Sequence, residues 1–511
     1  MRTISKYTSK TFILFGLIFA YFTIVLIAML VPSHVVSAAG NIFYVAATGN
    51  DITGNGSLTT PWATPQKAAN MMVAGDTCYI ETGTYGYFAV MTSGSPGNYE
   101  TFENYNGEVV NINGGTGYDN IWTHAQNYIQ FIGLRCVGTT TVGIDVDGNN
   151  ITVQNCYFSN CTSSGIDVGT VSNTIINGCE CSGTNTQGTN ECLSLYGANN
   201  FVVENCKVHD PIGTGRIGID AKDGCSNGSI HNNQVYDCGS VGIYCDGYGH
   251  PSSNINVYDN MVYNCASAGL AVNSENSPAA QTNINFYNNL VYNNGEGFVV
   301  WASPDFAKTF TIINNTFYNN GNMVEIGLYG SALDNSGCVI RNNIIVNSNA
   351  STVLLYYPAW SNDNGAYVSI DHNLFYDTNG YNANTFGSYF IQGNPLLSNP
   401  TTDFSLQIGS PAIGAGSATG APSTDYVGTT RPQTQGYDIG AYEYVVSSAP
   451  IESIAINAIL VTSIVLLPPA SASYRGVIAE VQGVNGVTDS LYVCLKSAAN
   501  TYSWVSIATG G

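Results

Sequence analysis

Charge is the scarcest property of this chain of 511 residues. Only 9% of the residues are charged, against roughly 25% in an average soluble domain. This scarcity argues against a helical protein covered with ion pairs. The chain has 34 acidic but only 13 basic residues and a formal net charge of -21. Nucleic acid and anionic membrane surfaces are therefore excluded as partners, because binding a polyanion requires many cations.

What the chain has instead favours strands and turns. It contains 56 Gly and 34 Tyr, many Asn, and few Lys, Glu or Leu. Asn and Gly are frequent in turns, whereas Tyr is enriched in strands. The composition thus predicts an all-β protein.

The N-terminus predicts export. Arg2, Lys6 and Lys10 precede an uncharged apolar run from Thr11 to Val31, and small residues follow at Ser37 to Ala39. This order is typical of a signal peptide with its cleavage site. We expect residues 1–39 to be an export signal and the protein to be secreted or held at the cell surface. The apolar run is also long enough for an uncleaved membrane anchor.

A repeated tetrapeptide is the strongest pattern in the sequence. Its first copy is Val-Gln-Asn-Cys, ending at Cys156, and a later copy is Phe-Tyr-Asn-Asn, ending at Asn289. The copies end at Cys156, Cys179, Cys206, Asn233, Asn260, Asn289, Asn315, Asn343 and Asn373, at intervals of 23 to 30 residues. A period near 27 residues with short strands predicts a solenoid, specifically a right-handed parallel β-helix.

Each repeat ends at a predicted corner of the coil. Asn tolerates the left-handed backbone region there, and its amide can bond to the Asn one coil away. We therefore expect an Asn ladder from Asn233 to Asn373, with Cys in the same position of the earlier coils. Tyr residues three positions further along predict a second stack, consisting of Tyr236, Tyr263, Tyr292 and Tyr318.

Cysteine placement follows the same repeat. The chain has 14 Cys, and in an exported protein a disulfide framework is one interpretation. Cys at inward repeat positions is more often a small buried apolar residue. We expect the second arrangement, although stacked positions could also bridge.

The first coil needs a cap, because an open β-helix end exposes unpaired strand edges. Thr64 is suited to the N-cap of a short helix, Pro65 to its first position and Gly75 to its end. We expect this helix to turn Ala68, Met71 and Met72 toward the coil.

Two segments outside the repeats resemble a known family. Phe43-Tyr-Val-Ala-Ala-Thr-Gly-Asn-Asp and Pro61-Trp-Ala-Thr-Pro-Gln-Lys-Ala-Ala look like the start of secreted right-handed β-helix proteins of the pectate-lyase-like superfamily. Ser410-Pro-Ala-Ile-Gly-Ala-Gly and Asp438-Ile-Gly-Ala-Tyr-Glu-Tyr are similar to the closing segment of many such proteins. The resemblance covers residues 41–445. It implies fold and compartment, whereas the superfamily includes lyases, hydrolases, epimerases and adhesins.

Candidate site residues follow from strand alternation after each Gly-Ile dipeptide. Outward residues of successive coils form columns, with neighbouring coils about 4.8 Å apart. The first column contains Asp145, Asp167, Ser194, Asp220, Tyr244, Ala271 and Val299. The second contains Asp147, Gly169, Tyr196, Lys222, Asp246, Asn273 and Trp301. A third, shorter column contains Gly224, Tyr248 and Glu275.

One patch of these columns has the chemistry of a sugar-cleaving site. Carboxylates act as acid, base or nucleophile at a glycosidic bond, and a cation recognises or deprotonates a uronate. The candidate catalytic residues are Asp220, Lys222, Asp246 and Glu275. The candidate substrate-binding residues are Tyr196, Arg216, Tyr244, Tyr248, His250 and Trp301. Asp220, Asp223 and Asp246 are candidate ligands of Ca²⁺, the one cofactor expected.

A polysaccharide lyase is the preferred interpretation. Ile219-Asp-Ala-Lys-Asp-Gly is similar to the segment carrying the catalytic lysine of the alginate lyase and chondroitinase B family. The resemblance implies that Lys222 removes the proton α to a uronate carboxyl while Ca²⁺ neutralises the substrate. The arginine of that family is absent from the next coil, which reads Gly242-Ile-Tyr-Cys-Asp-Gly. Nearby carboxylates also favour a charged lysine, so a base role requires a metal or burial to offset them.

Two alternatives stay open. In a glycoside hydrolase, a pair among Asp220, Asp246 and Glu275 would supply the acid and the nucleophile or base. In a non-enzymatic adhesin or spike, a long acidic rod would suffice. An extracellular polysaccharide is the expected partner.

The end of the chain is expected to be separate. Residues 446–469 form a predicted linker, and residues 470–511 contain three strand-like segments typical of a small β module. Such a module would serve attachment or oligomerisation.

Overall fold

The computed structural model describes most of the chain outside its two ends. The described ranges are 40–185, 191–211, 216–275, 280–301, 308–321, 323–329, 337–347, 353–356, 368–377, 387–433, 436–445, 478–481, 490–496 and 501–509. The predicted export signal and the predicted linker lie outside them. Within these ranges no helix is long and apolar enough to cross a membrane.

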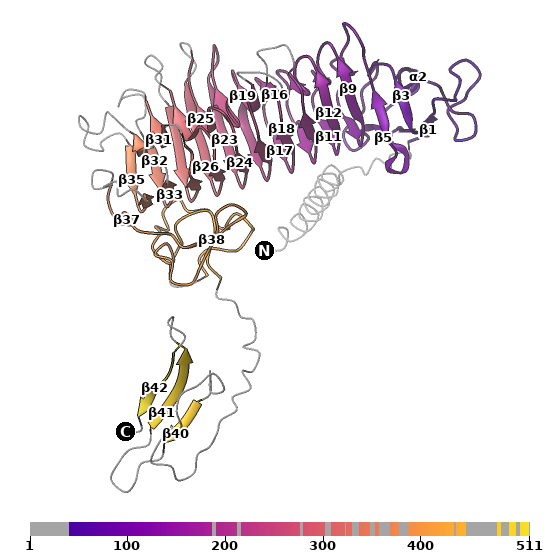
Figure 1. Cartoon of the computed structure of the whole chain (residues 1–511). Coiled ribbons are helices and arrows are strands. Elements are labelled where there is room, and N and C mark those ends of the chain that lie inside the picture. Colours follow the sequence, from indigo (N-terminus) through magenta and orange to yellow (C-terminus); the bar gives the residue numbers. More distant parts are fainter. Residues whose placement is uncertain are drawn as a thin grey trace, which may run out of the picture. The chain divides into compact units, whose positions relative to one another are not determined.

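Three parallel sheets run along the main unit, which ends at Tyr444. Most coils contribute one strand to each sheet, and Figure 1 shows the coils stacked in chain order from β1 to β35. The predicted all-β solenoid is confirmed, with thirteen, eleven and thirteen strands in sheets 1, 2 and 3.

Sheet 1 consists of β1 (Ile42–Val45), β2 (Thr77–Ile80), β5 (Glu100–Asn104), β8 (Ile129–Ile132), β11 (Ile151–Gln154), β14 (Ile175–Asn177), β17 (Val202–Glu204), β20 (Ser226–His231), β23 (Ser252–Tyr258), β26 (Gln281–Tyr287), β29 (Lys308–Ile313), β32 (Cys338–Arg341) and β35 (Val368–Asp371). Sheet 2 consists of β4 (Phe88–Ala89), β7 (Ile121–Trp122), β10 (Ile144–Val146), β13 (Ile166–Val168), β16 (Glu191–Tyr196), β19 (Ile217–Lys222), β22 (Ile243–Asp246), β25 (Ala268–Val272), β28 (Glu296–Val300), β31 (Val324–Leu328) and β34 (Val353–Tyr356). Sheet 3 consists of β3 (Gly83–Tyr85), β6 (Val110–Ile112), β9 (Arg135–Thr139), β12 (Tyr157–Cys161), β15 (Glu180–Ser182), β18 (Lys207–His209), β21 (Gln234–Tyr236), β24 (Met261–Tyr263), β27 (Leu290–Tyr292), β30 (Thr316–Tyr318), β33 (Ile344–Asn347), β36 (Leu374–Asp377) and β37 (Ile391–Gln392). A 3-10 turn, η1 (Tyr105–Gly107), follows β5.

The core fills the inside of the coils with aliphatic, Phe and Cys side chains. All fourteen Cys are buried and none forms a disulfide, which matches the expectation that they pack as small apolar residues. Inward positions on all three sheets therefore leave the outward positions to carry polar and functional groups.

The Asn ladder is present at the corner between sheets 1 and 3. Asn260 Nδ2 donates to Asn289 Oδ1 at 3.0 Å, and Asn289 Nδ2 donates to Asn315 Oδ1 at 2.9 Å. Each amide also donates to a carbonyl of the coil, as Asn289 does to Val257 O at 2.9 Å. The left-handed backbone lies one residue earlier than expected, for example at Asn288 with φ 54°.

The predicted Tyr stack is confirmed for three of its four members. The rings of Tyr236 and Tyr263, and those of Tyr263 and Tyr292, stack with centroids 5.0 Å apart. Tyr318 instead packs edge-on against Phe404 of the segment that follows the last coil.

The predicted cap is helix α2 (Pro65–Met71), and Thr64 Oγ1 accepts a hydrogen bond from the Lys67 backbone at 3.2 Å. Ala68 and Met72 are buried, but Met71 is 49% exposed, so its predicted place on the packed face is wrong. The helix also ends at Met71, before Gly75.

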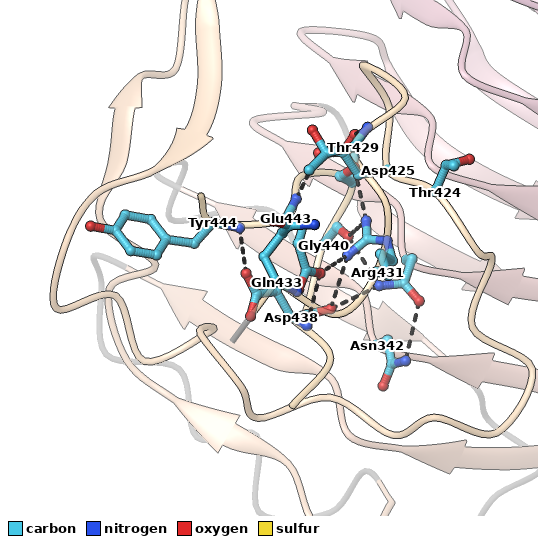
Figure 2. Close-up of polar contacts among 12 residues, drawn as sticks. Asn342, Thr424, Asp425, Thr429, Arg431, Gln433, Asp438, Gly440, Glu443 and Tyr444 are labelled. Atoms are coloured by element: carbon cyan, nitrogen blue, oxygen red, sulfur yellow. Dashed lines mark hydrogen bonds and ion pairs between the residues drawn. The ribbon is translucent and has the colours of Figure 1, made fainter. Parts of the chain in front are cut away.

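The closing segment, residues 395–444, packs against the outer face of sheet 3 and contains the hairpin β38 (Leu397–Asn399) and β39 (Asp403–Leu406). Figure 2 shows its centre, where Arg431 donates to Glu443 Oε2 at 2.8 Å and to Gly440 O at 3.0 Å. Both ionic side chains are fully buried. Asn314 and Asn342, from two coils of the solenoid, bond to the backbone of this segment.

The second unit begins at Val445. Its described part is an antiparallel sheet of β40 (Ile478–Val481), β41 (Ser490–Lys496) and β42 (Tyr502–Thr509). The small C-terminal β module is thus present.

Candidate functional site

The outer face of sheet 2 carries the predicted columns. Strand register pairs Ser194 with Asp220 and Asp220 with Tyr244 in the first column. It pairs Tyr196 with Lys222 and Lys222 with Asp246 in the second. The candidate residues from three successive strands, β16, β19 and β22, therefore lie side by side.

Lys222 is the centre of this region, and it is already paired. Its Nζ lies 2.5 Å from Glu191 Oε2, and only 23% of the Lys222 side chain and 6% of the Glu191 side chain are exposed. Burial alone lowers the pKa of Lys222, but Glu191, Asp220 and Asp246 together outweigh it and raise the pKa above its usual value. Lys222 is thus a fixed positive charge at neutral pH.

Asp220 and Asp246 are the buried acids beside it. Asp220 is 1% exposed, and burial, together with Asp246 and Glu191, raises its pKa well above the usual range. Asp246 is 7% exposed, and burial, followed by the charge of Glu275, raises its pKa to about 8 despite the opposing effect of Lys222. Burial therefore favours the protonated form of both carboxyls.

Each of these acids also has an oxygen without a partner. Oδ1 of Asp220 and Oδ1 of Asp246 are buried and accept no hydrogen bond from any group in the described ranges. Buried polar atoms are rarely left unpaired in a purely structural role. The pair is therefore a candidate functional centre, and we call Glu191, Asp220, Lys222, Asp246 and Glu275 the acidic cluster.

Tyr244 and Glu275 form the next contact. The Tyr244 hydroxyl donates to Glu275 Oε1 at 3.0 Å. Burial raises the pKa of Tyr244, as do the charges of Asp246 and Glu275, so the hydroxyl stays a donor. Tyr244 is only 4% exposed, and its ring meets Trp301 edge-on at 5.7 Å. It thus offers no open face to a sugar, and its hydroxyl contacts Glu275, which is exposed.

Three other predicted aromatic residues are more exposed than Tyr244 or border a cavity. Tyr196 is 43% exposed and Tyr248 is 62% exposed. Trp301 lines a cavity of about 450 Å³ together with Glu296 and Tyr329. Tyr196 and Tyr248 are therefore accessible to a ligand, and Trp301 borders a cavity.

Three other predicted residues, Asp223, His250 and Arg216, have partners of their own. Asp223 Oδ1 accepts the backbone N–H groups of Gly249 and His250, both at 2.6 Å, and lies 3.3 Å from His250 Nδ1. Although burial opposes it, this set of donors lowers the pKa of Asp223. Arg216 is 9% exposed and donates to Asn185 Oδ1 at 3.2 Å.

A Ca²⁺ site fits these residues only in part. The unpaired oxygens of Asp220 and Asp246 suit a cation, whereas the Asp223 oxygen is already occupied by two backbone donors. Among the described residues, no group of three His, Cys, Asp or Glu side chains is arranged to hold a metal ion.

Glu191 was missed by the column analysis. Strand β16 has Cys192-Leu193 at the place where β19 has the Gly-Ile dipeptide, so the Gly-Ile signature is absent from it. The residue before the dipeptide, which is Glu191 in β16, belongs to a further outward column. Register in that column pairs Glu191 with Ile217 and Ala268 with Glu296. The signal was Lys222 itself, because a largely buried lysine requires an acidic partner.

These observations define a solenoid of parallel coils with one sheet face that gathers buried, partly unpaired carboxyls. Two family descriptions match the chain: "Pel9A-like, right handed beta helix region" over residues 43–185 and "Right handed beta helix region" over residues 142–307. They confirm the right-handed β-helix and the resemblance to pectate-lyase-like proteins. The first match ends before the acidic cluster, so the resemblance of the Lys222 segment to alginate lyases stays a prediction.

Several solved structures have a similar course of the chain. Pectate lyase Pel9A is 17% identical, with 80% of this chain and 97% of that chain covered and a TM-score of 0.49. The surface adhesin PfbA of Streptococcus pneumoniae is 13% identical, with 64% and 87% covered and a TM-score of 0.45. An alginate lyase from Paenibacillus sp. str. FPU-7 is 16% identical, with 57% and 95% covered and a TM-score of 0.42. Likenesses of this degree carry no information on the reaction.

No curated protein sequence matches the chain significantly.

Proposed function

We propose that this protein is an extracellular enzyme that cleaves a polysaccharide at the acidic cluster, by acid-catalysed hydrolysis of a glycosidic bond. The observation that supports it most directly is the contrast between Asp246 and Lys222. Burial raises the pKa of Asp246 to about 8, which keeps a proton on this carboxyl at neutral pH. The base that a lyase would need is instead charged and held by Glu191 at 2.5 Å.

The roles follow from position. Asp246 donates its proton to the glycosidic oxygen, since a protonated carboxyl in a low-dielectric pocket is the usual general acid of a glycosidase. Glu275, exposed and oriented by the Tyr244 hydroxyl at 3.0 Å, is the base or nucleophile. Lys222 stabilises the negative charge that Asp246 acquires when it gives up its proton. Tyr196 and Tyr248, which are 43% and 62% exposed, offer their rings to the sugar.

A β-eliminating lyase is the second candidate, and one observation favours it. The unpaired oxygens of Asp220 and Asp246 lie in the same cluster as Lys222, where a cation would find ligands. A bound Ca²⁺ would supply positive charge, which neutralises a uronate and lowers the pKa of a nearby lysine. This candidate retains the resemblance of the Lys222 segment to alginate lyases.

The experiment compares the two chemistries on one panel of neutral and uronate polysaccharides, with Ca²⁺ and with chelator. Hydrolysis produces new reducing ends without ultraviolet absorbance, whereas elimination produces absorbing unsaturated ends. Three variants are assayed in parallel: Asp246→Asn, Lys222→Ala and, as a matched control, Lys207→Ala on the exposed outer face of sheet 3.

We expect Asp246→Asn to abolish hydrolysis and Lys222→Ala to weaken it while some turnover persists, because Lys222 assists and does not transfer the proton. Absorbing products that vanish in Lys222→Ala would replace the hydrolase proposal with the lyase. Binding without any cleavage across the panel would leave the adhesin alternative, in which the same face only holds the polysaccharide.

A further inference from the structure

A second recess lies on the same outer face of sheet 2, near the start of the solenoid. Tyr87, Tyr118, Asp119, Trp122 and Asp145 line a cavity of about 270 Å³, and we call these five residues the aromatic recess. The rings of Tyr87 and Tyr118 stack 4.5 Å apart with planes 10° from parallel. They are 42% and 55% exposed, so they add little to the core.

The recess is rigidly built. Trp122 Nε1 donates to Asp147 Oδ2 at 2.9 Å, and Asp147 Oδ1 accepts from Thr123 Oγ1 and the Ala125 backbone, both at 2.6 Å. The indole is thereby held in one orientation by a carboxylate that is itself fixed. The two exposed tyrosine rings stack on each other beside this fixed indole. Exposed aromatic side chains gathered in a recess are typical of ligand sites, whereas folding alone favours their burial.

The recess and the acidic cluster share one column of outward residues. Register pairs Trp122 with Asp145, Asp145 with Asp167, and Asp167 with Ser194. Ser194 pairs in turn with Asp220. Four strand spacings of about 4.8 Å place Trp122 roughly 19 Å from Asp220 along the solenoid axis. A straight ligand can therefore reach both sites along the column.

The charge of this path identifies the class of ligand. Asp119 and Asp145 line the recess, and Asp167 lies between it and the cluster. Lys222, at the far end, is already paired with Glu191. Burial raises the pKa of Asp145 to about 7 and also raises that of Asp167, so this path carries part of its full negative charge at neutral pH. That charge repels a polyuronate, whereas the hydroxyls of a neutral sugar can donate hydrogen bonds to the carboxyls in either protonation state.

We propose that the aromatic recess binds sugar rings of a neutral polysaccharide whose chain extends along sheet 2 to the acidic cluster. This inference rests on the proposed function, because it assumes that the cluster acts on a polysaccharide. It assigns to Tyr87 and Tyr118 the recognition of a part of the substrate distant from the cleaved bond.

The test measures binding without turnover, in the Asp246→Asn background. Affinity electrophoresis is run in gels containing xylan, galactomannan or β-glucan, and in gels containing polygalacturonate or alginate. We expect retardation by at least one neutral polysaccharide, and a weakening of about tenfold in the Tyr87→Ala/Tyr118→Ala double variant. Tyr389→Ala is the matched control, since Tyr389 is 78% exposed and lies on a different part of the coil.

Unchanged affinity in the double variant, or equal retardation by the polyuronates, would overturn the inference. The single variant Tyr118→Ala and thermal melting guard against a folding defect. The two proposals fail differently: cleavage with unchanged affinity in the double variant contradicts only the recess, whereas recess-dependent binding without cleavage by the native chain contradicts only the proposed function.

Discussion

The Asn ladder and the acidic cluster are two rows of buried polar groups on the same solenoid, and they are satisfied very differently. In the ladder, Asn289 donates to Val257 O and to Asn315 Oδ1, and its own Oδ1 accepts from Asn260. In the cluster, Asp220 and Asp246 each retain an oxygen that has no donor in the described part of the chain. The first row is complete, and the second is not.

The difference shows what each row is for. A row of amides whose hydrogen bonds are all made stabilises the fold and has no free donor or acceptor for a ligand. A row of buried carboxyls with unpaired oxygens and raised pKa values costs stability and is poised to exchange protons. Replacing a ladder residue should therefore damage the fold, and replacing a cluster residue should damage the reaction.

The largest expected effect is on activity, in Asp246→Asn. The amide is nearly isosteric but cannot donate a proton to the leaving oxygen, so we expect turnover to fall roughly 100- to 10,000-fold. The free energy of unfolding should stay equal or rise, because a buried ionisable group is removed. Reducing-end assays and thermal melting measure both. Near-native turnover would contradict the role of Asp246.

The converse change is Asn289→Ala in the ladder. It leaves Val257 O and the Asn260 donors without partners, so we expect the free energy of unfolding to fall by roughly 3 kcal/mol. Turnover at low temperature should be preserved. Asn256→Ala, at a half-buried outward position, is the control and should cost under about 1 kcal/mol. Chemical denaturation of the variants measures these changes in the free energy of unfolding. An Asn289→Ala variant as stable as the native chain would show that the fold does not need the ladder.

A third expectation concerns pH. Burial raises the pKa of Asp246 to about 8 and that of Asp145, Asp259 and Glu100 to about 7. A raised pKa means that the folded state binds these protons more tightly than the unfolded chain does. Their contribution to stability is complete in acid and is lost as pH rises through 7 to 8. Thermal melting from pH 5 to 9 should show this decline, and turnover should fall as Asp246 ionises. A flat stability profile would refute it.

The smallest expected effect belongs to Tyr244→Phe. It removes the 3.0 Å hydrogen bond to Glu275 and leaves the buried ring in place. The loss of one such bond is worth about 1 kcal/mol, so we expect turnover to fall about fivefold with little change in stability. Steady-state kinetics measures this effect, and an unchanged turnover number would remove Tyr244 as a positioning residue.

The solenoid, the ladder and the columns could be predicted because each follows from the repeat itself. Once the coil length is known, register places Asp220 beside Tyr244 and Lys222 beside Asp246. The pairing of Lys222 with Glu191 could not be predicted this way, since it depends on a strand without the Gly-Ile signature and on side-chain direction. The column of a residue likewise does not show how far its side chain is exposed. The burial of Tyr244 could therefore not be predicted.

The left-handed corner was misplaced by one residue for a similar reason. Both residues of the Asn-Asn pair tolerate that conformation, and composition does not distinguish them. The structure assigns it to the first, as in Asn288 and Asn314, which frees the second amide to point inward and join the ladder. Those first residues then face outward and become available to the closing segment.

The contacts of these outward Asn side chains with the closing segment determine where the solenoid begins to unfold. Asn288, Asn314 and Asn342, on three successive coils, all bond to the closing segment. A solenoid otherwise contacts only its nearest neighbours and can unzip one coil at a time. Near the C-terminal end of the solenoid, the closing segment joins these three coils to one another. The first coil, by contrast, is covered by α2, a helix of seven residues. Unfolding should therefore start beside α2 and proceed toward the coils held by the closing segment. Hydrogen exchange measured by mass spectrometry should then be fastest in the early coils.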